Sequence, residues 1–550
     1  MSYRNRILLN IRKQVKFYCR LKQSFFTLHS LITHHSSLIT FSTGFLLTVL
    51  TTVVSAQNRP NVILIVSDDH AYQAISAYGS KLAQTPGIDR IAKEGVIFKR
   101  AYVTNSICGP SRAVILTGKY SHKNGFKDNV TTRFDSSQNT FIKELTRSGY
   151  QTAWIGKWHL QALPQGFTYF QVFPGQGSYY NPDIIMMDGS RKRLEGYAST
   201  ITEDLAEKWM TERDTSKPFC LVIGHKAPHR MWQPDTADLG RFDSVNFPLP
   251  PNFYDNYQGR EAAKVQDMSI DKTMRMDYDL KMFDSTIKEL SILRMNAAQR
   301  AKSDPYYAAI YADLKSKNLS GKALVEWKYQ RYMRDYLSTA ASMDRNIQRT
   351  LDYLDKNDLS SNTIVIYISD QGFYLGEHGW FDKRFMYEES FRTPMVMRYP
   401  GKIKAGTSNT DLVMNLDIGP TILEAAGVKV PADMQGRSFL PLVSGNKIEN
   451  KSAKKLKWRD AIYYHYYEHG EHAVSPHFGV STKRYKLIRF YQDVNSWELY
   501  DLEKDPNEMN NIYGSKGTEN ITGGLMKKLH EAIDHYEDTE AKQILAQIKN

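Results

Sequence analysis

Residues Asn61-Val62-Ile63-Leu64-Ile65-Val66 form a continuous apolar run rich in β-branched side chains. Because both alternating faces of the run are apolar, it predicts a strand buried on both sides, as in a parallel sheet. The run ends in Ser67-Asp68-Asp69-His70. Open α/β sheets bind ligands at the carboxyl ends of such strands, and two adjacent carboxylates there favour a bound cation. A solvated turn is the alternative interpretation.

The same pattern recurs along the chain, where apolar strand signals alternate with helical ones, as is typical of an α/β fold. Three further predicted strands end in polar residues: Thr152–Ile155 is followed by Gly156-Lys157-Trp158-His159, Phe219–Ile223 by a segment containing His229, and Thr363–Ile368 by Ser369-Asp370-Gln371-Gly372. We therefore expect these polar segments to meet at one edge of the sheet. Oxygen donors without thiolates suit a hard cation such as calcium or magnesium.

A helix is predicted to begin at Cys108-Gly109-Pro110-Ser111-Arg112 and to continue through Leu116-Thr117-Gly118-Lys119. Pro110 suits the first turn of a helix, so Cys108 lies at the positive helix end. Such a position attracts anions and activates thiols, and Arg112 adds a fixed charge suited to an oxyanion. The segment predicts an anion site that contains a reactive side chain. A free cysteine packed at a helix start is the alternative.

The pattern Cys-x-Pro-Ser-Arg followed by Leu-Thr-Gly resembles the signature of the type I sulfatases, and the resemblance extends from about Arg59 to about Asn511. It implies an alkaline-phosphatase-like α/β sandwich with a large mixed, mostly parallel sheet. It also implies that a formylglycine-generating maturation enzyme oxidises Cys108 to formylglycine (3-oxoalanine). The implied ligands of a calcium or magnesium ion are Asp68, Asp69, Asp370, Gln371 and an oxygen of residue 108. Gln371 stands where the family usually has asparagine.

The resemblance also implies catalytic roles for several basic residues. Hydrated formylglycine attacks the sulfur, while the cation and the side chains of Arg112, Lys157 and Lys383 hold the sulfate charge. His229 matches the general acid that protonates the leaving alcohol, and His159 matches the base that lets the hemiacetal collapse and expel sulfate. Lys119 and His122 are expected to hold the catalytic residues in position without contacting the substrate.

Within the family, three segments resemble bacterial N-acetylglucosamine-6-O-sulfatases: Gln73 to Gly79, Lys226 to Arg230, and Asp370 to Arg384. This resemblance implies a sulfated carbohydrate substrate from host or dietary glycans, of the heparan or mucin type. The residues expected to read the sugar are Asp382, Arg384 and His477. The alternatives are another carbohydrate, aryl or choline sulfatase, a phosphonate or phosphate monoester hydrolase of the same superfamily, and a catalytically silent glycan-binding protein.

Residues 1–56 contain seven basic residues, no acidic residue, and an apolar stretch from Phe41 to Val54 that ends in Val54-Ser55-Ala56. That order predicts a secretory signal peptide, and hence a periplasmic or secreted protein without stable membrane insertion after cleavage. The alternative is a membrane anchor, although the apolar run is short and interrupted by serine and threonine. Without the leader the formal net charge falls from +13 to +6. This mild bias suits an anionic substrate and does not predict nucleic acid as a partner.

At 550 residues the chain exceeds the usual size of a single core, so we expect a catalytic domain and a smaller partner. The catalytic domain is expected over 57–430, with a helical insertion packed on the sheet over about 248–330. A C-terminal α+β subdomain over 431–550 should contain four short antiparallel strands (Ala461–Tyr467, Phe478–Thr482, Tyr485–Tyr491 and Trp497–Leu502) and a helix at Thr522–Tyr536. A cluster there has three interpretations, a second metal site, substrate contacts or mere surface; its members are His465, Glu468, His469, Glu471, His472 and His477.

Overall fold

A ten-stranded sheet runs through the computed structural model, in the order β11-β2-β10-β9-β1-β8-β4-β5-β6-β7. Its centre is parallel: β1 (Asn61–Ser67) lies between β8 (Phe219–Gly224) and β9 (Thr363–Ser369). β4 (Gln151–Lys157) pairs in parallel with β8, and β5 (Tyr169–Phe173) pairs in parallel with β4. The parallel centre confirms the interpretation of the apolar runs, and it brings the polar segments after β1, β4, β8 and β9 to one edge.

The outer strands are shorter and include the antiparallel pairs. They are β2 (Val96–Phe98), β6 (Asp183–Ile185), β7 (Arg191–Arg193), β10 (Met395–Arg398) and β11 (Thr407–Asn409). β10 runs antiparallel to β9 and β2, and β6 runs antiparallel to β5 and β7. A separate parallel pair joins β3 (Ala101–Tyr102) to β12 (Val413–Met414).

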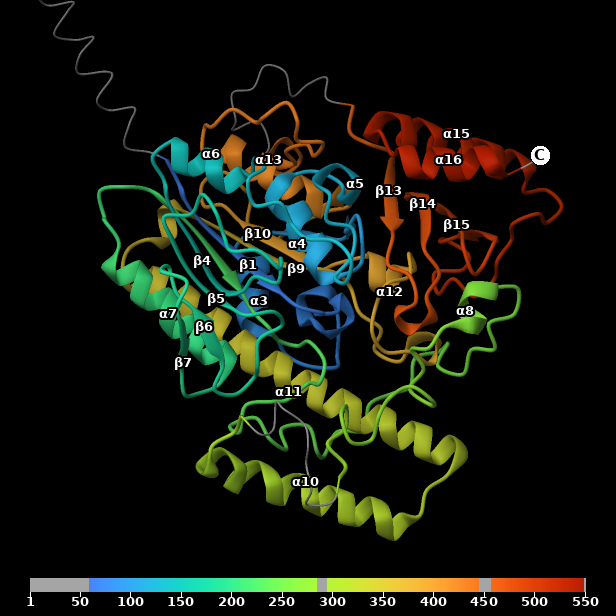
Figure 1. Cartoon of the computed structure of the whole chain (residues 1–550), viewed down its shortest axis with the longest axis horizontal. Helices are drawn as coiled ribbons and strands as arrows, with labels where there is room; N and C mark the ends of the chain where they lie inside the picture. The colour runs from blue at the N-terminus through green and yellow to red at the C-terminus, as the bar shows by residue number, and fades with distance from the viewer. Residues whose placement is uncertain (1–58, 284–293, 445–456, 549–550) are drawn as a thin grey trace, which may run out of the picture. The chain divides into compact units, whose positions relative to one another are not determined.

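Helices cover both faces of the sheet because alternate side chains of β1 point into two separate cores. Val62, Leu64 and Val66 belong to one core, and Ile63 and Ile65 belong to the other. The helices lining the first core are α4 (Cys108–Thr117), α6 (Phe141–Arg147), α13 (Ile418–Ala425) and α14 (Leu440–Val443); those lining the second are α3 (Pro86–Lys93), α7 (Ala198–Glu212) and α11 (Gly321–Lys356). Figure 1 shows the two helix layers on opposite sides of the central strands.

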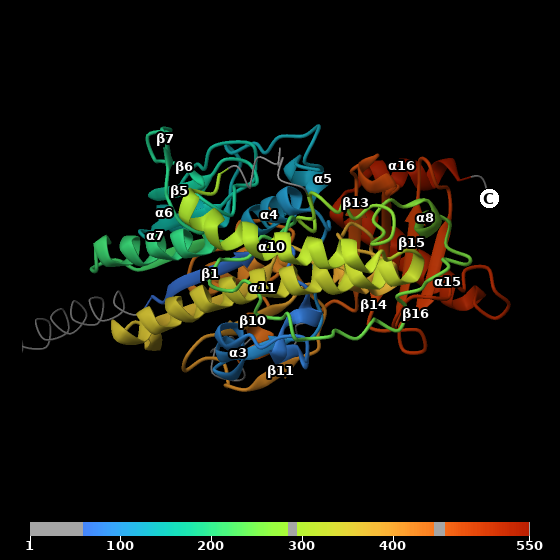
Figure 2. The same cartoon turned by 90° about the horizontal axis from the view of Figure 1, so that it is seen from below.

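The predicted helical insertion contains α8 (Glu261–Val265), α10 (Ala297–Lys317) and the beginning of α11. Asn296 and Gln299 form a capping box that starts α10, since each side chain accepts a hydrogen bond from the other residue's backbone N–H. Side chains of α10 share a core with α11, and the two helices lie side by side (Figure 2). The insertion packs on α11 through this core. It also reaches the sheet, because Met295 joins the core on one face of the sheet and Arg294 pairs with Asp183 of β6 at 2.8 Å.

The C-terminal region forms a four-stranded antiparallel sheet, each strand within one residue of its predicted bounds. The strands are β13 (Ala461–Tyr466), β14 (His477–Thr482), β15 (Tyr485–Phe490) and β16 (Trp497–Asp501). α15 (Glu519–Tyr536) contacts β13, β14 and β15. α16 (Thr539–Gln547), which the sequence did not predict, follows it and begins at Asp538, whose side chain accepts from the backbone N of Ala541. Two further short helices are α5 (Ser121–Asn124) and α12 (Glu388–Phe391).

The structure describes residues 59–283, 294–444 and 457–548. From Pro60 onward the described residues belong to one compact unit, so the domain boundary near residue 430 stays a prediction. The expected signal peptide, residues 1–56, lies outside the described residues. Within the described ranges, no helix combines the length and the apolar character needed to cross a membrane.

Candidate active site

Three buried carboxylates and an amide meet where β1 and β9 end. Ser67 pairs with Ser369 in the register of these parallel strands, so the two residues that follow each strand lie side by side. The backbone N of Asp69 donates to Oδ1 of Asp370 at 3.2 Å, and the amide of Gln371 donates to Oδ1 of Asp69. The structure thus brings together the predicted oxygen donors Asp68, Asp69, Asp370 and Gln371, each at most 1% exposed.

The chemistry of this donor set fits a hard cation. Burial raises the pKa of Asp69 well above its usual value and that of Asp370 to about 7, and the charge of Asp68 adds to both shifts. Two buried oxygens, Oδ1 of Asp68 and Oε1 of Gln371, have no hydrogen-bond partner among the described residues. Crowded carboxylates and unpartnered buried oxygens are both costly, and a calcium or magnesium ion would relieve both.

Three cations surround the carboxylates. Arg112, which is 0% exposed, donates from Nε to Oδ2 of Asp370 at 2.8 Å and from NH1 to the carbonyl of Lys157 at 2.8 Å. Nζ of Lys157 bonds Asp68, and Nζ of Lys383 donates to both oxygens of Asp69. Each aspartate therefore has its own buried cation, and the structure brings together all three cations that the sequence had singled out.

Cys108 is the first residue of α4, and it is 1% exposed. Its Sγ accepts from the side-chain amides of Asn129 at 3.5 Å and Gln176 at 3.9 Å, and Gln176 also accepts from Nζ of Lys157. A Cβ at Gly109 would lie 2.4 Å from Oδ1 of Asn129, so glycine is what allows the helix to start this close. Sequence reasoning missed Asn129 and Gln176, because both lie in loops without a strand or helix signal.

Two predicted histidines face this site. Nδ1 of His229 lies 2.6 Å from the carbonyl of Arg230, so that nitrogen carries a hydrogen, and Nε2 lies 3.8 Å from Oδ2 of Asp69. Nδ1 of His159 is buried without a hydrogen-bond partner in the described ranges. Burial lowers the pKa of both rings well below the usual value. Both are therefore neutral imidazoles with a nitrogen left for a ligand.

Several residues of the site have strained backbone conformations. Four predicted site residues have left-handed backbone conformations: Asp69 (φ 65°), His159 (φ 58°), Asp382 (φ 81°) and Arg384 (φ 93°). For residues other than glycine, such conformations cost about 1–3 kcal/mol each, and they cluster where a functional arrangement needs them. Other described residues away from the site, such as Asn318 and Glu537, have the same conformation, so strain accompanies the site without defining it.

A model of the sulfatase family matches residues 60–428, and a model described as N-sulphoglucosamine sulphohydrolase, C-terminal, matches residues 376–535. The chain belongs to the sulfatase family. It is 48% identical over 495 residues to the N-acetylglucosamine-6-O-sulfatase of Bacteroides thetaiotaomicron, which covers 88% of each chain. It is 27% identical over 510 residues to an N-acetylglucosamine-6-sulfatase of Capra hircus, covering 82% of this chain and 80% of that one.

Solved structures of related proteins have the same fold as this sulfatase. A protein in complex with its substrate D-glucosamine-2-N,6-O-disulfate has a TM-score of 0.84 to this sulfatase and 48% identity, covering 87% of this chain and 98% of that one. The phosphonate monoester hydrolase of Agrobacterium radiobacter, at 19% identity and a TM-score of 0.63, covers 87% and 96% and shares the fold alone. The comparisons confirm the predicted fold and class: this sulfatase is a sulfuric ester hydrolase.

A second charged group, which we call the rim, lies beside Lys383 and consists of Asp382, Arg384 and His472. Oδ1 of Asp382 forms an ion pair with NH1 of Arg384 at 2.7 Å, and Oδ2 faces Nε2 of His472 at 2.9 Å. Arg230 reaches the rim with NH1 3.4 Å from Nε2 of His472. Glu468 and Glu471 lie 3.9 and 3.8 Å from Arg384. Asp382 and Arg384 thus meet as predicted, and the C-terminal region supplies the histidine.

His477 is not the histidine of the rim, so that prediction was wrong. Its ring is 0% exposed, Nε2 accepts from the backbone N of Met386 at 3.1 Å, and Nδ1 donates to the carbonyl of Ser475 at 2.9 Å. It also stacks on Phe385. Both ring nitrogens are used by the backbone, so His477 is a core residue that joins β14 to the segment after the rim.

Lys119 and His122 do not stand behind Cys108, contrary to prediction. Nζ of Lys119 pairs with Asp433 at 2.5 Å. His122 contacts the carbonyl of Tyr536 at 2.8 Å and the hydroxyl of Tyr467 at 3.0 Å. Both side chains therefore tie the helix region after Cys108 to later parts of the chain.

The histidine and glutamate cluster of the C-terminal region divides among four environments: the rim, a buried pair with Asp538, an exposed pair of His469 with Asp493, and the core position of His477. Glu468, Glu471 and His472 lie at the rim, and His465 bonds Asp538 at 2.7 Å. Among the described residues, the group with metal-ligand spacing is Asp68, Asp69 and His229, whose ligand atoms lie within 4.8 Å of one another. The second-metal interpretation of the cluster was therefore wrong.

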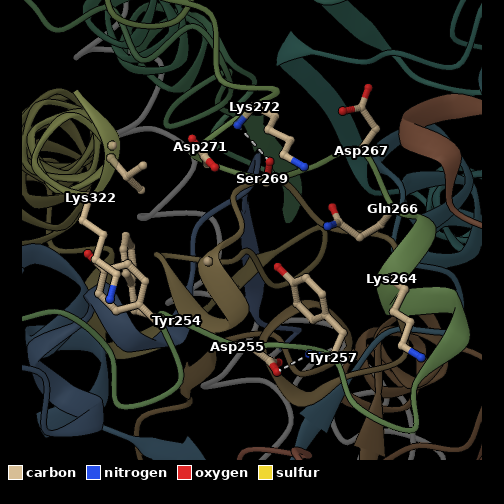
Figure 3. A pocket seen from close by; sticks show the side chains of 14 residues that line it. Tyr254, Asp255, Tyr257, Lys264, Gln266, Asp267, Ser269, Asp271, Lys272 and Lys322 are labelled. Atoms are coloured by element: carbon tan, nitrogen blue, oxygen red, sulfur yellow. Dashed lines mark hydrogen bonds between the residues drawn. The ribbon is translucent and has the colours of Figure 1, made fainter.

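A cavity of about 470 Å³ lies next to the rim, between α8, the loops around it and the start of α11 (Figure 3). Asp267 lines it, and the backbone N of Asp267 donates to the carbonyl of His472 at 2.6 Å. The charged side chains of the lining are Lys264, Lys272, Lys322, Asp255, Asp267 and Asp271. Three lysines balance three aspartates, so the lining of the cavity has no formal net charge.

Proposed function

We propose that this sulfatase removes the 6-O-sulfate of N-acetylglucosamine from host or dietary glycans of the heparan or mucin type. The observation that carries the proposal is the rim directly beside Lys383. Lys383 faces the sulfate side of the site, while Asp382 and Arg384 present a carboxylate and a guanidinium that can hold neighbouring sugar hydroxyls. The 48% identical relative, named as an N-acetylglucosamine-6-O-sulfatase, supports this choice.

The proposal includes a modified residue and a cation. Formylglycine at position 108, made by a maturation enzyme, would supply the nucleophilic hydroxyl of a hydrated aldehyde, and a calcium or magnesium ion would supply positive charge beside it. The residues that would hold the ion are Asp68, Asp69, Asp370, Gln371 and residue 108. The unpartnered oxygens of Asp68 and Gln371 support this assignment. The leader predicted over residues 1–56 supports export to the periplasm or the medium.

The other side chains of the site then have separate tasks. Lys157 and Lys383, with their Nζ atoms at the carboxylates, bind the sulfate oxygens, while Arg112 holds Asp370 in place and adds charge. His229 keeps a hydrogen on Nδ1 through the carbonyl of Arg230, so Nε2 faces the site. The ring first takes up a second proton at Nε2, which the negative charge of a bound sulfate ester favours, and Nε2 then delivers that proton to the leaving alcohol. His159 accepts the proton whose removal frees sulfate.

A desulfation screen over defined compounds tests the specificity. We expect the fastest turnover on N-acetylglucosamine-6-sulfate and slower turnover on galactose-6-sulfate, in which one hydroxyl that the rim would read points the other way. Choline sulfate and aryl sulfate lack those hydroxyls, and aryl phosphate tests the phosphonate or phosphate hydrolase alternative. Equal turnover of the two sugars, or faster turnover of the phosphate, would refute the proposal.

The modification is tested separately by mass spectrometry of the tryptic peptide that contains Cys108. We expect an aldehyde in place of the thiol in active protein. Cys108→Ala should abolish turnover and leave the melting temperature nearly unchanged, because the side chain lies at a helix end. An intact thiol in fully active enzyme would end this part of the proposal. An intact thiol in a protein without turnover would instead favour the alternative of a glycan-binding protein.

A further inference from the structure

A pocket of about 790 Å³ lies in the C-terminal region and is lined by the end of β15, the loop to β16, and α16. Arg489 and Trp497 form part of its wall, and they are directly opposite each other on the paired strands β15 and β16. The other lining residues used below are Asn495, Gln492, Gln543, Gln547 and Glu540. None of these residues belongs to the catalytic site or the rim.

Arg489 is a buried cation without an acidic partner. It is 5% exposed, and its contacts within the described ranges include no carboxylate. NH2 donates to Oδ1 of Asn495, Nε has no hydrogen-bond partner among the described residues, and Cζ lies 5.3 Å from the centre of the Trp497 ring. A buried charge that lacks a counter-ion is costly, so its place beside an open pocket needs an explanation.

The other buried arginines of this sulfatase show what Arg489 lacks. Each pairs with a carboxylate: Arg112 with Asp370, Arg260 with Asp255, Arg331 with Asp335, Arg384 with Asp382, and Arg398 with Glu94. Glu540 also lines the pocket, but its carboxylate pairs with Nζ of Lys127 at 2.7 Å. Arg489 thus has donors left for an anion that comes from outside the chain.

The rest of the lining suits a sugar. The side-chain amides of Asn495, Gln492 and Gln543 can donate to and accept from hydroxyls. Trp497 stacks on Tyr513 and has the Arg489 guanidinium over its ring, so it holds that guanidinium at the pocket. One wall of the pocket is also tied to the rim region, because Asp493, next to Gln492, pairs with His469 at 2.6 Å, and His469 directly follows Glu468. A glycan held in this pocket would therefore lie beside the loop that helps to form the rim.

We propose that this pocket binds an acidic sugar unit of a glycan outside the catalytic centre, with Arg489 on its oxyanion and the side-chain amides of the lining on its hydroxyls. The oxyanion is a uronate carboxylate or a sulfate. A guanidinium can donate two parallel hydrogen bonds to two oxygens of either group. The inference rests on the proposed function, since it assumes that the substrate is a glycan. It adds a second site that would hold the polymer while the catalytic site works on its terminal sugar.

The test is calorimetric titration of the full-length Cys108→Ala protein, with excess N-acetylglucosamine-6-sulfate present to fill the catalytic site. The titrants are a heparin hexasaccharide with sulfates and carboxylates, a heparosan hexasaccharide with carboxylates alone, and neutral cellohexaose. We expect heparin to bind and Arg489→Gln to weaken that binding roughly ten- to a hundred-fold, as the loss of a charged hydrogen bond predicts. The matched control is Arg484→Gln, because Arg484 precedes the same strand but pairs with Asp501 at 2.9 Å.

The outcomes separate the possibilities. Heparosan binding as tightly as heparin identifies the carboxylate, and heparin binding alone identifies the sulfate. Equal binding by the Arg489→Gln and Arg484→Gln proteins, or cellohexaose binding as tightly as heparin, overturns the proposal. If Arg489→Gln does not fold, Gln543→Glu at an exposed position of α16 adds a repelling carboxylate and should weaken heparin binding about ten-fold.

Turnover of the monosaccharide keeps the two proposals apart. With Cys108 intact, Arg489→Gln should desulfate N-acetylglucosamine-6-sulfate at the wild-type rate, because its pocket does not reach that sugar. Loss of monosaccharide turnover in this variant would overturn the assignment of a separate site. Absence of turnover in the wild type would instead refute the proposed function.

Discussion

Nζ of Lys383 lies 2.6 and 2.8 Å from the two carboxylate oxygens of Asp69. The side chains on either side of Lys383 belong to a different charged group, because Asp382 and Arg384 pair with each other at 2.7 Å. Asp382 and Arg384 have left-handed backbone conformations, with φ of 81° and 93°. Three consecutive side chains therefore contact two different groups, Asp69 and the rim. The groups proposed to hold the sulfate and those proposed to read the sugar are thus covalent neighbours.

Asp382→Ala should therefore separate sugar recognition from catalysis. A charged hydrogen bond is worth about 1.5–3 kcal/mol, so we expect kcat/KM on N-acetylglucosamine-6-sulfate to fall roughly ten- to a hundred-fold. An aryl sulfate, which has no hydroxyls for Asp382 to bind, should be largely spared. Steady-state kinetics on both substrates checks this, and equal losses would mean that Asp382 supports the catalytic centre and reads no sugar.

The sequence assigned His477 to the sugar site, whereas the structure places His472 at the rim. Alanine variants of the two histidines can therefore be compared. His472→Ala should raise KM for the sugar sulfate and cost less stability than His477→Ala, because its ring lies at the rim and not in the hydrophobic core. His477→Ala should instead lower the free energy of unfolding by at least about 2 kcal/mol, since it opens a core cavity and leaves the backbone N of Met386 unpaired. Calorimetry and steady-state kinetics on both variants measure these effects. A raised KM for His477→Ala together with a large loss of stability for His472→Ala would return His477 to the sugar site.

Removal of the cation should cost both activity and stability. Asp68, Asp69 and Asp370 would be left to repel one another in a buried site. An ion present at a hundred times its dissociation constant stabilises the folded state by about 2.7 kcal/mol, and chelation removes that contribution. Exhaustive chelation followed by calorimetry should show the loss, and added calcium or magnesium should reverse it. Unchanged activity and melting temperature after chelation would refute the cation.

The buried carboxyl group of Glu203 should make the free energy of unfolding depend on pH, independently of catalysis. It lies on α7 with 0% exposure, and burial raises its pKa from 4.5 to about 8. The folded protein keeps this proton up to about pH 8 while the unfolded chain releases it near pH 4.5, so the contribution to stability is full below 4.5 and is lost as pH rises through 8.

Glu203→Gln should remove that part of the dependence. Relative to wild type, the variant should gain stability near pH 8.5 and gain little near pH 4.5, because the neutral amide imitates the protonated acid. Urea unfolding across this range measures the effect. Glu212→Gln, at an exposed position of the same helix, is the control and should show no such trend. A wild-type profile parallel to that of Glu203→Gln would contradict the prediction.

The central strands and most of the catalytic set were predictable from the sequence because their signals are local. Apolar runs that end in Asp68-Asp69 or Asp370-Gln371 define strand and ligand together, and parallel pairing of β1 with β9 then brings them into contact. Lys383 was predictable only through the family resemblance, since Asp382-Lys383-Arg384 otherwise resembles a solvated helix start.

The errors fall where contacts depend on loops. Asn129 and Gln176 reach Cys108 from segments without periodicity, so no pattern indicated them. His472 and His477 are five residues apart in one cluster, and sequence alone does not show that β14 begins at His477 and buries it. Lys119 and His122 follow the cysteine helix closely, yet the chain turns at Gly118 and directs them toward the C-terminal region.

The most direct test of the account is a crystal structure of Cys108→Ala with N-acetylglucosamine-6-sulfate bound. We predict the sulfate between residue 108, Lys157 and Lys383, and the sugar hydroxyls on Asp382, Arg384 and His472. A sulfate at that place with the sugar ring turned away from the rim would contradict the proposed specificity. A sulfate bound elsewhere would contradict the site itself.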